Sequence, residues 1–330
     1  MNCNTCERLT NVTGLNADIA EYTTINPNTN LQETVTPPTK IFKNCKALTS
    51  IKGNRLKSTS CEEYFMGCYA LEELDITNID FSQASNFSGA FCRCYELPWT
   101  EIKKVLNSPA ATNASYIFCY KYYDPEKPSL GQVPADIFNN VPNITSLARA
   151  FSFSAGSTYY TVGQEVPDGY LKINVINTPQ ITLTGVTNMS HFANNSSITS
   201  LPGLNKFPNV TDVSGAFRST LITTVPSNVF ANNTKITPTL ATFADCTSIT
   251  SSIGNILSGL TDLTTARGMF YLSTIKGSVP KGFLRTNRVL TNTSLMFYKT
   301  NITGVNPLFL DDDDQATGTY ALNNISSMFG

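Results

Sequence analysis

One pattern of apolar and polar residues recurs along this chain. A Phe is followed three residues later by Cys, Asn, Thr or Ser, then by a branched apolar residue, and often by Gly or Val-Pro. The segment Phe42–Gly53 matches the segment Phe243–Gly254 at these positions. Self-similarity of this kind is typical of stacked structural repeats. The pattern therefore predicts a solenoid, in which each unit buries its apolar side chains against its neighbours.

Each unit is called a row below, and its phenylalanine the marker. The markers are Phe42, Phe65, Phe91, Phe118, Phe151, Phe192, Phe217, Phe243, Phe270, Phe297 and Phe329. Most are 23–27 residues apart, which is the period of leucine-rich repeats, and three rows carry insertions. We therefore expect one leucine-rich-repeat solenoid of about eleven or twelve rows, with short parallel β-strands on one face and short helical or 3₁₀ segments on the other.

A small side chain recurs three residues after the marker. If the marker is position 6 of a leucine-rich repeat, this residue is position 9, which is normally Asn or Cys. A small polar side chain there can satisfy backbone groups that a sharp turn after the strand leaves unpaired. The expected structural ladder is Cys45, Cys68, Cys94, Ser154, Asn195, Thr220, Cys246, Ser273 and Thr300, and Lys121 breaks the rule. We expect its four cysteines to be buried, reduced and unbridged.

A second phrase, Val-Pro followed within four residues by Phe or Leu, marks the return of several rows. It occurs at residues 133–138, 166–171, 225–230 and 279–284. Proline favours the first turn of a helix, where its missing N–H costs no hydrogen bond. We expect a short helical or 3₁₀ segment on the outer face of these rows, with the Phe or Leu pointing inward.

The register divides the chain into two parts. Residues 1–38 are expected to form an N-terminal partial repeat plus an inserted loop, because Cys6–Gly14 aligns with Cys45–Gly53. Residues 39–330 are expected to form the solenoid, with insertions near 122–133, 152–186 and 306–323. Neither end shows the polar cap that an isolated solenoid requires. We expect either that the natural chain continues past Gly330 or that another subunit covers the exposed row.

The phrases Ala90–Cys94, Met189–Phe192, Val213–Phe217 and Met269-Phe270 resemble the BspA-like leucine-rich-repeat family, the bacterial surface proteins with a 26-residue repeat. The resemblance covers about residues 39–330, and more weakly residues 1–15. It implies the solenoid fold and a role as an adhesin or surface-binding protein, with ligands that differ between members of the family.

Composition excludes several classes of partner. Charged residues make up 14% of the chain, against roughly 25% in average proteins, and the net charge is -1. Such a chain has no field to attract nucleic acid. No stretch approaches 18 apolar residues, so we expect no membrane insertion, and the first residues lack the pattern of a signal peptide. We expect no cofactor.

The nine cysteines offer weak candidates for chemistry. Cys3-x-x-Cys6 and Cys92-x-Cys94 have the spacing of zinc ligand pairs. Cys6 and Cys94 also fall on position 9, however, which accounts for them structurally. Cys61, Cys92 and Cys119 lie off that position and are the better candidates for a disulfide or a reactive thiol.

Acidic residues offer two further candidates. Asp311, Asp312, Asp313 and Asp314 are a weak candidate for a calcium site, although a run of four acids is more often a solvated loop tip. The carboxylates of Glu62, Glu63, Glu72 and Glu73 cluster over two rows and could act as acid and base, or simply occupy exposed row edges. The only histidine, His191, builds no Ser/His/Asp or Cys/His arrangement from spacing alone. We therefore expect a non-enzymatic protein.

Tyrosines concentrate in the insertions, where repeat proteins commonly bind ligands. Tyrosine combines apolar contact area with a hydroxyl at low entropic cost, which suits recognition of proteins or sugars. The candidate ligand-binding residues are Tyr120, Tyr122, Tyr123, Tyr159, Tyr160 and Tyr170, unless these rings only cover widened rows.

Two functions remain open. The first is a recognition or adhesion module that binds a protein or glycan surface. The second is a structural component of a larger assembly, such as a virion or fibre, with homo- or hetero-oligomer contacts through the solenoid ends. An extracellular surface or a virion is the favoured location for either.

Overall fold

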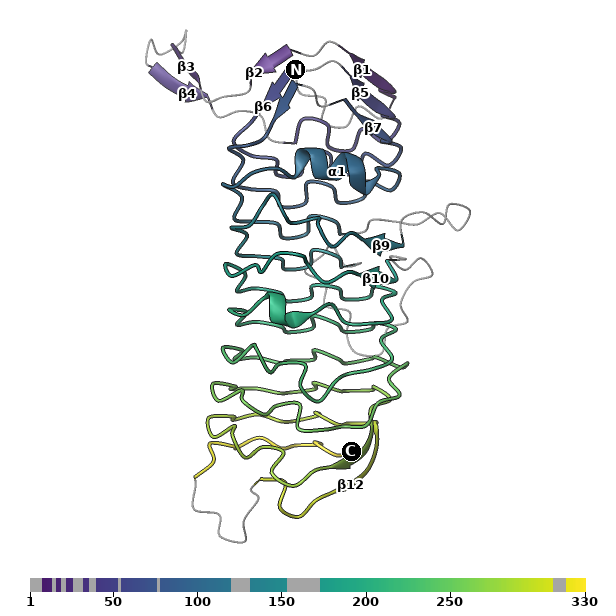
Figure 1. Cartoon of the computed structure of the whole chain (residues 1–330), viewed down its shortest axis with the longest axis vertical. Helices are drawn as coiled ribbons and strands as arrows, with labels where there is room; N and C mark the ends of the chain where they lie inside the picture. Colours follow the sequence, from purple (N-terminus) through teal and green to yellow (C-terminus); the bar gives the residue numbers. More distant parts are fainter. Residues whose placement is uncertain are drawn as a thin grey trace.

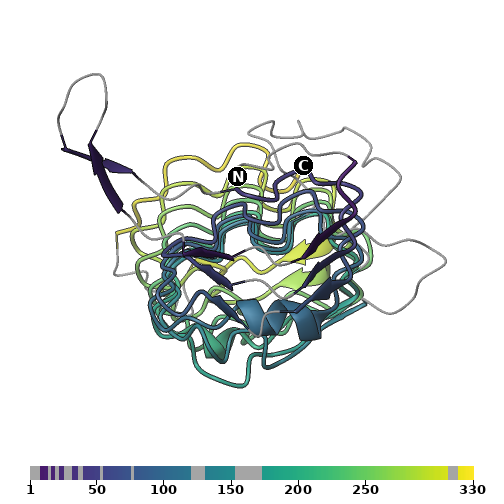
Figure 2. The same ribbon diagram turned by 90° about the horizontal axis from the view of Figure 1, so that it is seen from above.

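The computed structural model describes residues 8–13, 16–18, 22–25, 32–35, 40–52, 55–75, 78–119, 131–152, 173–310 and 319–330. The rows stack along one axis into an elongated body, with the N-terminal rows at one end and the C-terminal rows at the other (Figure 1). Viewed along the axis, the rows superimpose on one another (Figure 2). The predicted solenoid architecture is therefore the architecture of the described chain.

Short parallel strands follow position 9 on one side of the stack. They are β1 (Asn11–Thr13), β5 (Ser50–Lys52) and β7 (Glu73–Leu74), then β9 (Gln132–Val133) with β10 (Val175–Ile176), and β11 (Lys276–Val279) with β12 (Asn301–Val305). In the first sheet, Val12 pairs with Ile51 and Ile51 pairs with Leu74. One branched apolar residue per row thus faces the core at the same level, which explains the apolar positions after Cys in the repeat.

The N-terminal region adds strands of its own. A second parallel sheet, β2 (Asn16–Asp18), β6 (Arg55–Lys57) and β8 (Asn78–Asp80), lies on the opposite side of the stack (Figure 2). An antiparallel hairpin, β3 (Tyr22–Ile25) and β4 (Gln32–Val35), projects away from the rows (Figure 1). The expected inserted loop therefore contains a hairpin.

The marker segments are runs of turns, whereas the assigned register placed the short strand of each row before the turn at position 9. Every second N–H reaches the next row: Glu63 N donates to Ser88 O at 2.8 Å, Phe65 N to Ala90 O at 3.1 Å and Gly67 N to Cys92 O at 2.8 Å. The N–H groups between them turn back within their own row, as Met66 N does to Glu63 O at 3.2 Å. We call this array the turn ladder. It pairs buried backbone groups without regular strands.

The return segments are also turns. Val133 and Val279 each end a strand, and Val229 N donates to Pro226 O at 3.1 Å in a single turn. The expected helical segments are too short to continue beyond that turn, and residues 166–171 lie outside the described part. Helical structure in the described chain is instead α1 (Trp99–Val105) and the 3₁₀ helix η2 (Leu204–Lys206). Nothing in the described residues is a helix long and apolar enough to cross a membrane.

The core is a column of marker rings. From Phe42 to Phe151 successive rings stack at centroid distances of 5.3–6.1 Å, and from Phe217 to Phe329 at 5.5–5.8 Å. Phe192 interrupts the column, because its ring meets Phe151 and Phe217 edge-on, at interplanar angles of 79° and 75°.

A one-residue difference in register explains the interruption. Ala193 N donates to Ala216 O, just as Phe217 N donates to Thr242 O in the next row, so Ala193 occupies the marker place in the turn ladder. Phe192 lies one place earlier and still enters the core, where it is 1% exposed. Position 9 of this row is consequently Ser196, and the assignment of Asn195 to the structural ladder is wrong.

Candidate functional site

The position-9 side chains connect neighbouring rows. The thiols of Cys68, Cys94 and Cys246 donate to the carbonyl oxygen of the marker in the preceding row, at 2.9, 3.0 and 3.1 Å. Thr220 and Thr300 instead donate to the marker carbonyl of their own row, at 2.8 and 2.9 Å. Cys45, Cys68, Cys94 and Cys246 are all buried and outside any disulfide, as expected. Burial raises the pKa of the Cys246 thiol to about 11, so it stays a protonated donor.

The remaining members of the predicted structural ladder differ. Ser273 is buried, and its hydroxyl has no hydrogen-bond partner within the described residues. Asn195 has a left-handed φ of 59°, like Asn44 and Asp245 two places after their markers. Asn195 therefore lies one residue before Ser196, the small side chain at position 9 of its row. Ser154 lies outside the described residues.

Cys92 and Cys119 form a disulfide between adjacent rows, with their Cα atoms 4.7 Å apart. Both were among the three cysteines predicted to be available for pairing. The third, Cys61, is free and fully buried, and burial raises its thiol pKa well above the usual range. Cys3 and Cys6 lie outside the described residues, and within the described part no group of His, Cys, Asp or Glu side chains is placed to hold a metal ion.

The tyrosine and aspartate candidates cannot be placed. Tyr120, Tyr122, Tyr123, Tyr159, Tyr160 and Tyr170, and likewise Asp311, Asp312, Asp313 and Asp314, fall outside the described residues. Ligand binding by these tyrosines and calcium binding by these aspartates stay predictions.

The glutamate cluster is engaged in ion pairs. Glu63 lies 3.0 Å from the ammonium of Lys40 and 2.5 Å from that of Lys43, and Glu73 lies 2.7 Å from Lys52. Burial opposes ionisation of Glu63, but the two lysines outweigh it and lower the pKa of this carboxyl. Glu63 is therefore held as a carboxylate, which makes it a poor proton donor.

A large concavity among the described rows lies over the turn ladder. It has a volume of about 970 Å³ and extends over the seven rows from Tyr116 to Leu295, and we call it the central hollow. Gly215, Ala241 and Gly268, each two residues before its marker, form its floor in three successive rows. The corresponding places in the rows on either side carry His191 and Leu295. The hollow thus exists because three consecutive rows lack a large side chain at one place.

Backbone geometry and packing both require a small residue at Gly215. Its φ is +59°, in the left-handed region. A Cβ built there would lie 2.6 Å from Nδ1 of His191 in the adjacent row. At Gly268, by contrast, the nearest atom to such a Cβ is 3.6 Å away, so only the positive φ disfavours a side chain.

Three arginines line the central hollow in alternate rows. Arg149 lies with its guanidinium 5.6 Å from the ring centroid of Tyr116. Two rows further, Arg218 Nε contacts Asp245 Oδ2 at 2.8 Å. Arg267, two rows beyond that, is exposed. The lining includes one carboxylate, Asp212, whose Oδ1 accepts the Ser214 N–H at 2.8 Å.

His191 lies between the first two arginines and is held neutral. Partial burial, and then the positive charges of Arg149 and Arg218, lower its pKa to about 4, against the smaller opposite effect of Asp212. Its Nδ1 lies 3.2 Å from the amide nitrogen of Asn194. Ser190, His191 and Asp212 all line the hollow, but the Ser190 hydroxyl donates to Asn188 Oδ1 at 2.8 Å. The described contacts therefore form no Ser–His–Asp relay.

The titration of His191 is directly testable, because the chain contains one histidine. We expect its imidazole NMR signals to titrate with a midpoint near pH 4. Arg149→Gln is expected to raise the midpoint by removing a like charge, while Lys235→Gln, whose lysine contacts Asn209 outside the hollow, should leave it unchanged. Because the unfolded chain takes up this proton near pH 6.5, His191 should lower stability only as pH falls from 6.5 towards 4. A midpoint near 6.5 would contradict the placement.

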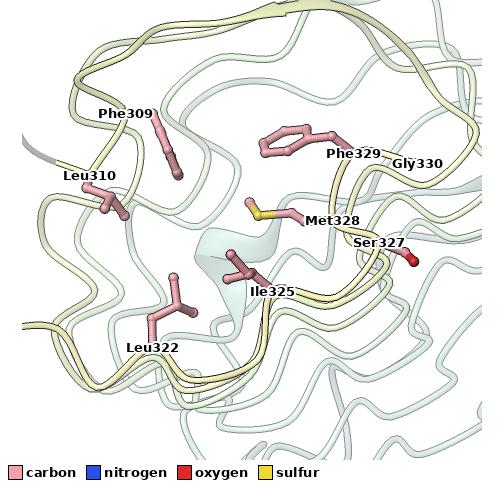
Figure 3. Close-up of a pocket in the computed structure, with 8 residues that line it drawn as sticks. All are labelled: Phe309, Leu310, Leu322, Ile325, Ser327, Met328, Phe329 and Gly330. Carbon is pink, nitrogen blue, oxygen red and sulfur yellow. The ribbon is translucent and has the colours of Figure 1, made fainter.

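A second, smaller concavity lies on the face of the last row. Its volume is about 380 Å³, and Figure 3 shows Phe309, Leu310, Leu322, Ile325, Met328 and Phe329 around it. Ile325 is 60% exposed and Phe329 is 42% exposed. In this chain the apolar core layer is therefore open to solvent at that face.

Comparisons with known proteins give matches among solved structures. No family model matches the chain, and neither does any curated protein. Among solved structures, an internalin from Listeria monocytogenes aligns at 15% identity over 83% of this chain and 75% of that chain, with a TM-score of 0.31. The Toll–Spatzle complex of Drosophila aligns at 16% identity over 81% of this chain, with a TM-score of 0.28, and PEPR1–AtPEP1 at 13% over 81%, with 0.31.

These neighbours are leucine-rich-repeat proteins, and this chain spans 34% of the Toll chain and 39% of PEPR1. TM-scores this low carry no argument about the present molecule. Its repeat architecture follows instead from its own hydrogen-bond ladders and ring column.

The central hollow was missed by sequence reasoning, which placed recognition in the insertions. The signal was present, since Gly215, Ala241 and Gly268 share one place in the repeat. Its meaning depends on knowing that this place points outward with a positive φ, and the assumption of a strand before position 9 concealed that.

Proposed function

We propose that this protein is a non-enzymatic recognition module that binds the surface of a protein or glycan through the central hollow. One observation carries the proposal: an open concavity of about 970 Å³ crosses seven rows and combines guanidinium groups with apolar side chains. Binding sites are typically concave, largely apolar and furnished with a few polar groups that fix orientation. The rigid stack beneath the hollow supplies preorganisation, which reduces the entropic cost of binding.

The chemistry of the hollow favours recognition over catalysis. Its histidine has a pKa of about 4, too low for an efficient general base near neutral pH. The Ser190 hydroxyl and the carboxylate of Asp212 are engaged in the turns of their own rows, by the contacts of Ser190 with Asn188 and of Asp212 with Ser214. The arginines, by contrast, are donors suited to holding an anionic partner.

We propose a finer relationship as well, to the BspA-like type of leucine-rich repeat. Its support is the Ala-Phe or Met-Phe phrase of the marker segments, at Ala90-Phe91, Ala216-Phe217 and Met269-Phe270. Position 9 with its buried cysteine thiols agrees with that type of repeat.

The proposal is tested by filling the hollow. Ala241 lies on the floor of the hollow and already has a left-handed φ of 52°. Ala241→Trp should therefore obstruct the hollow without requiring a new backbone conformation. Lys299→Trp is the matched control, since Lys299 is exposed, has a φ of 51° and lies outside the lining. The wild-type chain and both variants are screened against a displayed random-peptide library and a glycan array.

We expect to select ligands whose affinity for the wild type and for the control is at least tenfold higher than their affinity for the Ala241→Trp variant. Failure to select any ligand, or equal binding by all three chains, would reject recognition through this hollow.

An assembly role is the second candidate, and the apolar end face favours it. A contiguous apolar surface of this kind commonly marks a contact between proteins. If the end face packs on another subunit of a virion or fibre, light scattering should show association that Phe329→Glu and Ile325→Lys abolish together. A wild-type chain that remains monomeric at high concentration would count against this role.

A further inference from the structure

The arginines of the central hollow come from alternate rows of the solenoid, at different places within each row. Arg149, Arg218 and Arg267 belong to the rows of Phe151, Phe217 and Phe270, with one row between each pair. Adjacent rows joined by parallel backbone hydrogen bonds are about 4.8 Å apart, so the arginine rows are roughly 9.6 Å apart. The seven rows of the hollow span on the order of 29 Å.

This spacing matches one backbone conformation of a bound peptide. A polyproline II segment rises about 3.1 Å per residue with three residues per turn, so every third side chain lies on the same face about 9.3 Å further on. A segment of about nine residues would cover the hollow. Carboxylates at every third residue of such a segment would lie about 9.3 Å apart, close to the distance of roughly 9.6 Å between successive arginine rows.

Two of the guanidinium groups have N–H donors that the contacts among the described residues do not use. The contact of Arg218 with Asp245 uses Nε and leaves both terminal nitrogens. The guanidinium of Arg267, two rows along, is exposed at the rim. Since a guanidinium can hold a carboxylate through two parallel hydrogen bonds, this lining suits carboxylates better than neutral ligands.

The spaces between the arginines are apolar. Leu240, 38% exposed, and Leu295 line the hollow beside the alanine and glycine floor. Tyr271, half-buried, stacks on Tyr298 at 5.3 Å and closes one side. Proline or aliphatic side chains of a peptide would contact all of these groups, whereas a sugar ring would offer its apolar C–H face mainly to the ring of Tyr271 and leave the two leucines without apolar partners. The lining therefore favours a peptide over a glycan.

We propose that the central hollow binds an extended, polyproline II-like segment of a protein partner, aligned with the solenoid axis and carrying a carboxylate at every third residue, with Arg149, Arg218 and Arg267 as the carboxylate-binding residues. This inference rests on the proposed recognition function and specifies the partner of that same site.

The test uses the full 330-residue chain and four synthetic probes. Three are fluorescein-labelled twelve-residue peptides of the repeat Glu-Pro-Ala, Gln-Pro-Ala or Lys-Pro-Ala, and the fourth is a labelled sulfated oligosaccharide. Binding is measured by fluorescence polarisation at 50 mM and 200 mM salt. We expect the glutamate peptide to bind at least tenfold more tightly than the glutamine peptide, the lysine peptide not to bind, and the affinity to fall at the higher salt.

Variants then locate the binding. Arg267→Gln and Arg218→Gln should each lower the affinity for the glutamate peptide at least fivefold. Arg285→Gln, at an exposed arginine outside the hollow, should leave its affinity unchanged. Circular dichroism of each variant separates loss of binding from loss of folding.

The inference is overturned if the glutamate and glutamine peptides bind equally, if the arginine variants bind like the wild type, or if the oligosaccharide alone binds. If one of these results is obtained but ligands selected from the library still bind the wild type more tightly than the Ala241→Trp variant, recognition through the hollow stands. Only the acidic-peptide partner is then rejected. Where nothing binds in either experiment, both proposals fail.

Discussion

Phe243→Ala is expected to destabilise the protein by about 3–5 kcal/mol, the usual cost of truncating a buried phenylalanine. The Phe243 ring is fully buried and stacks on Phe217 at 5.8 Å and on Phe270 at 5.5 Å. Alanine would remove both ring contacts and leave a cavity in the middle of the column. Chemical denaturation monitored by circular dichroism measures the loss.

The damage should also be local. Rows interact with their nearest neighbours, so native-state hydrogen exchange should accelerate in the rows of Phe217, Phe243 and Phe270 and remain unchanged near Phe65. Leu240→Ala is the matched control, because Leu240 lies in the same row but is 38% exposed, and it should cost less than about 1 kcal/mol. Uniform acceleration from end to end would show that the chain unfolds as a single cooperative unit.

The second large effect is expected at a buried asparagine. Asn233 is fully buried, and its side-chain amide donates to Leu204 O at 3.1 Å and to Phe207 O at 2.8 Å in the preceding row. Asn233→Leu keeps the branched shape of the side chain and removes both of these hydrogen bonds, while each carbonyl keeps one backbone donor, Phe207 N at 3.0 Å and Val210 N at 3.2 Å. Each lost hydrogen bond contributes about 0.5–1.5 kcal/mol, so we expect a loss of about 1–3 kcal/mol in chemical denaturation.

The neighbouring residue provides the control. Asn232 is exposed, and Asn232→Leu should change the free energy of unfolding by less than about 0.5 kcal/mol. Asn287, which donates to Leu257 O at 3.1 Å and Leu260 O at 2.8 Å, should behave like Asn233. If Asn233→Leu were as mild as Asn232→Leu, these two hydrogen bonds would contribute little to holding the rows together.

These asparagines show a regularity that the sequence reading overlooked. Asn233, Asn287 and Ser108 each lie ten residues before a marker. Each asparagine donates two hydrogen bonds to carbonyl groups of the preceding row, and the single Ser108 hydroxyl hydrogen lies between two such carbonyl groups, Ser82 O and Ala84 O. The recurrence is visible in the sequence. Its role is not, because the acceptors are backbone carbonyls that any residue supplies, and they become partners only when the rows stack.

The sequence-based misassignments have a related cause. A spacing of 23–27 residues establishes that rows exist, but not which part of each row is extended. The short strand was therefore placed before position 9, although the backbone of the marker segment alternates between hydrogen bonds to the next row and hydrogen bonds within its own row. At Phe192 the pattern of residue types placed the marker one residue early, because two adjacent positions both face the core and either accepts a phenylalanine.

The repeat pattern of the sequence is enough to predict the stacking of rows, the burial of their apolar side chains and the burial of Cys45, Cys68, Cys94 and Cys246. These features repeat with the row, and only one arrangement buries all of them together. Tertiary structure alone decided the disulfide between Cys92 and Cys119, the break in the ring column and the central hollow. Each of these depends on which residues of different rows lie side by side, and insertions of unequal length hide that from the linear order. The hollow in particular is defined by side chains that three rows lack, and their absence forms a concavity only once the rows on either side are in place.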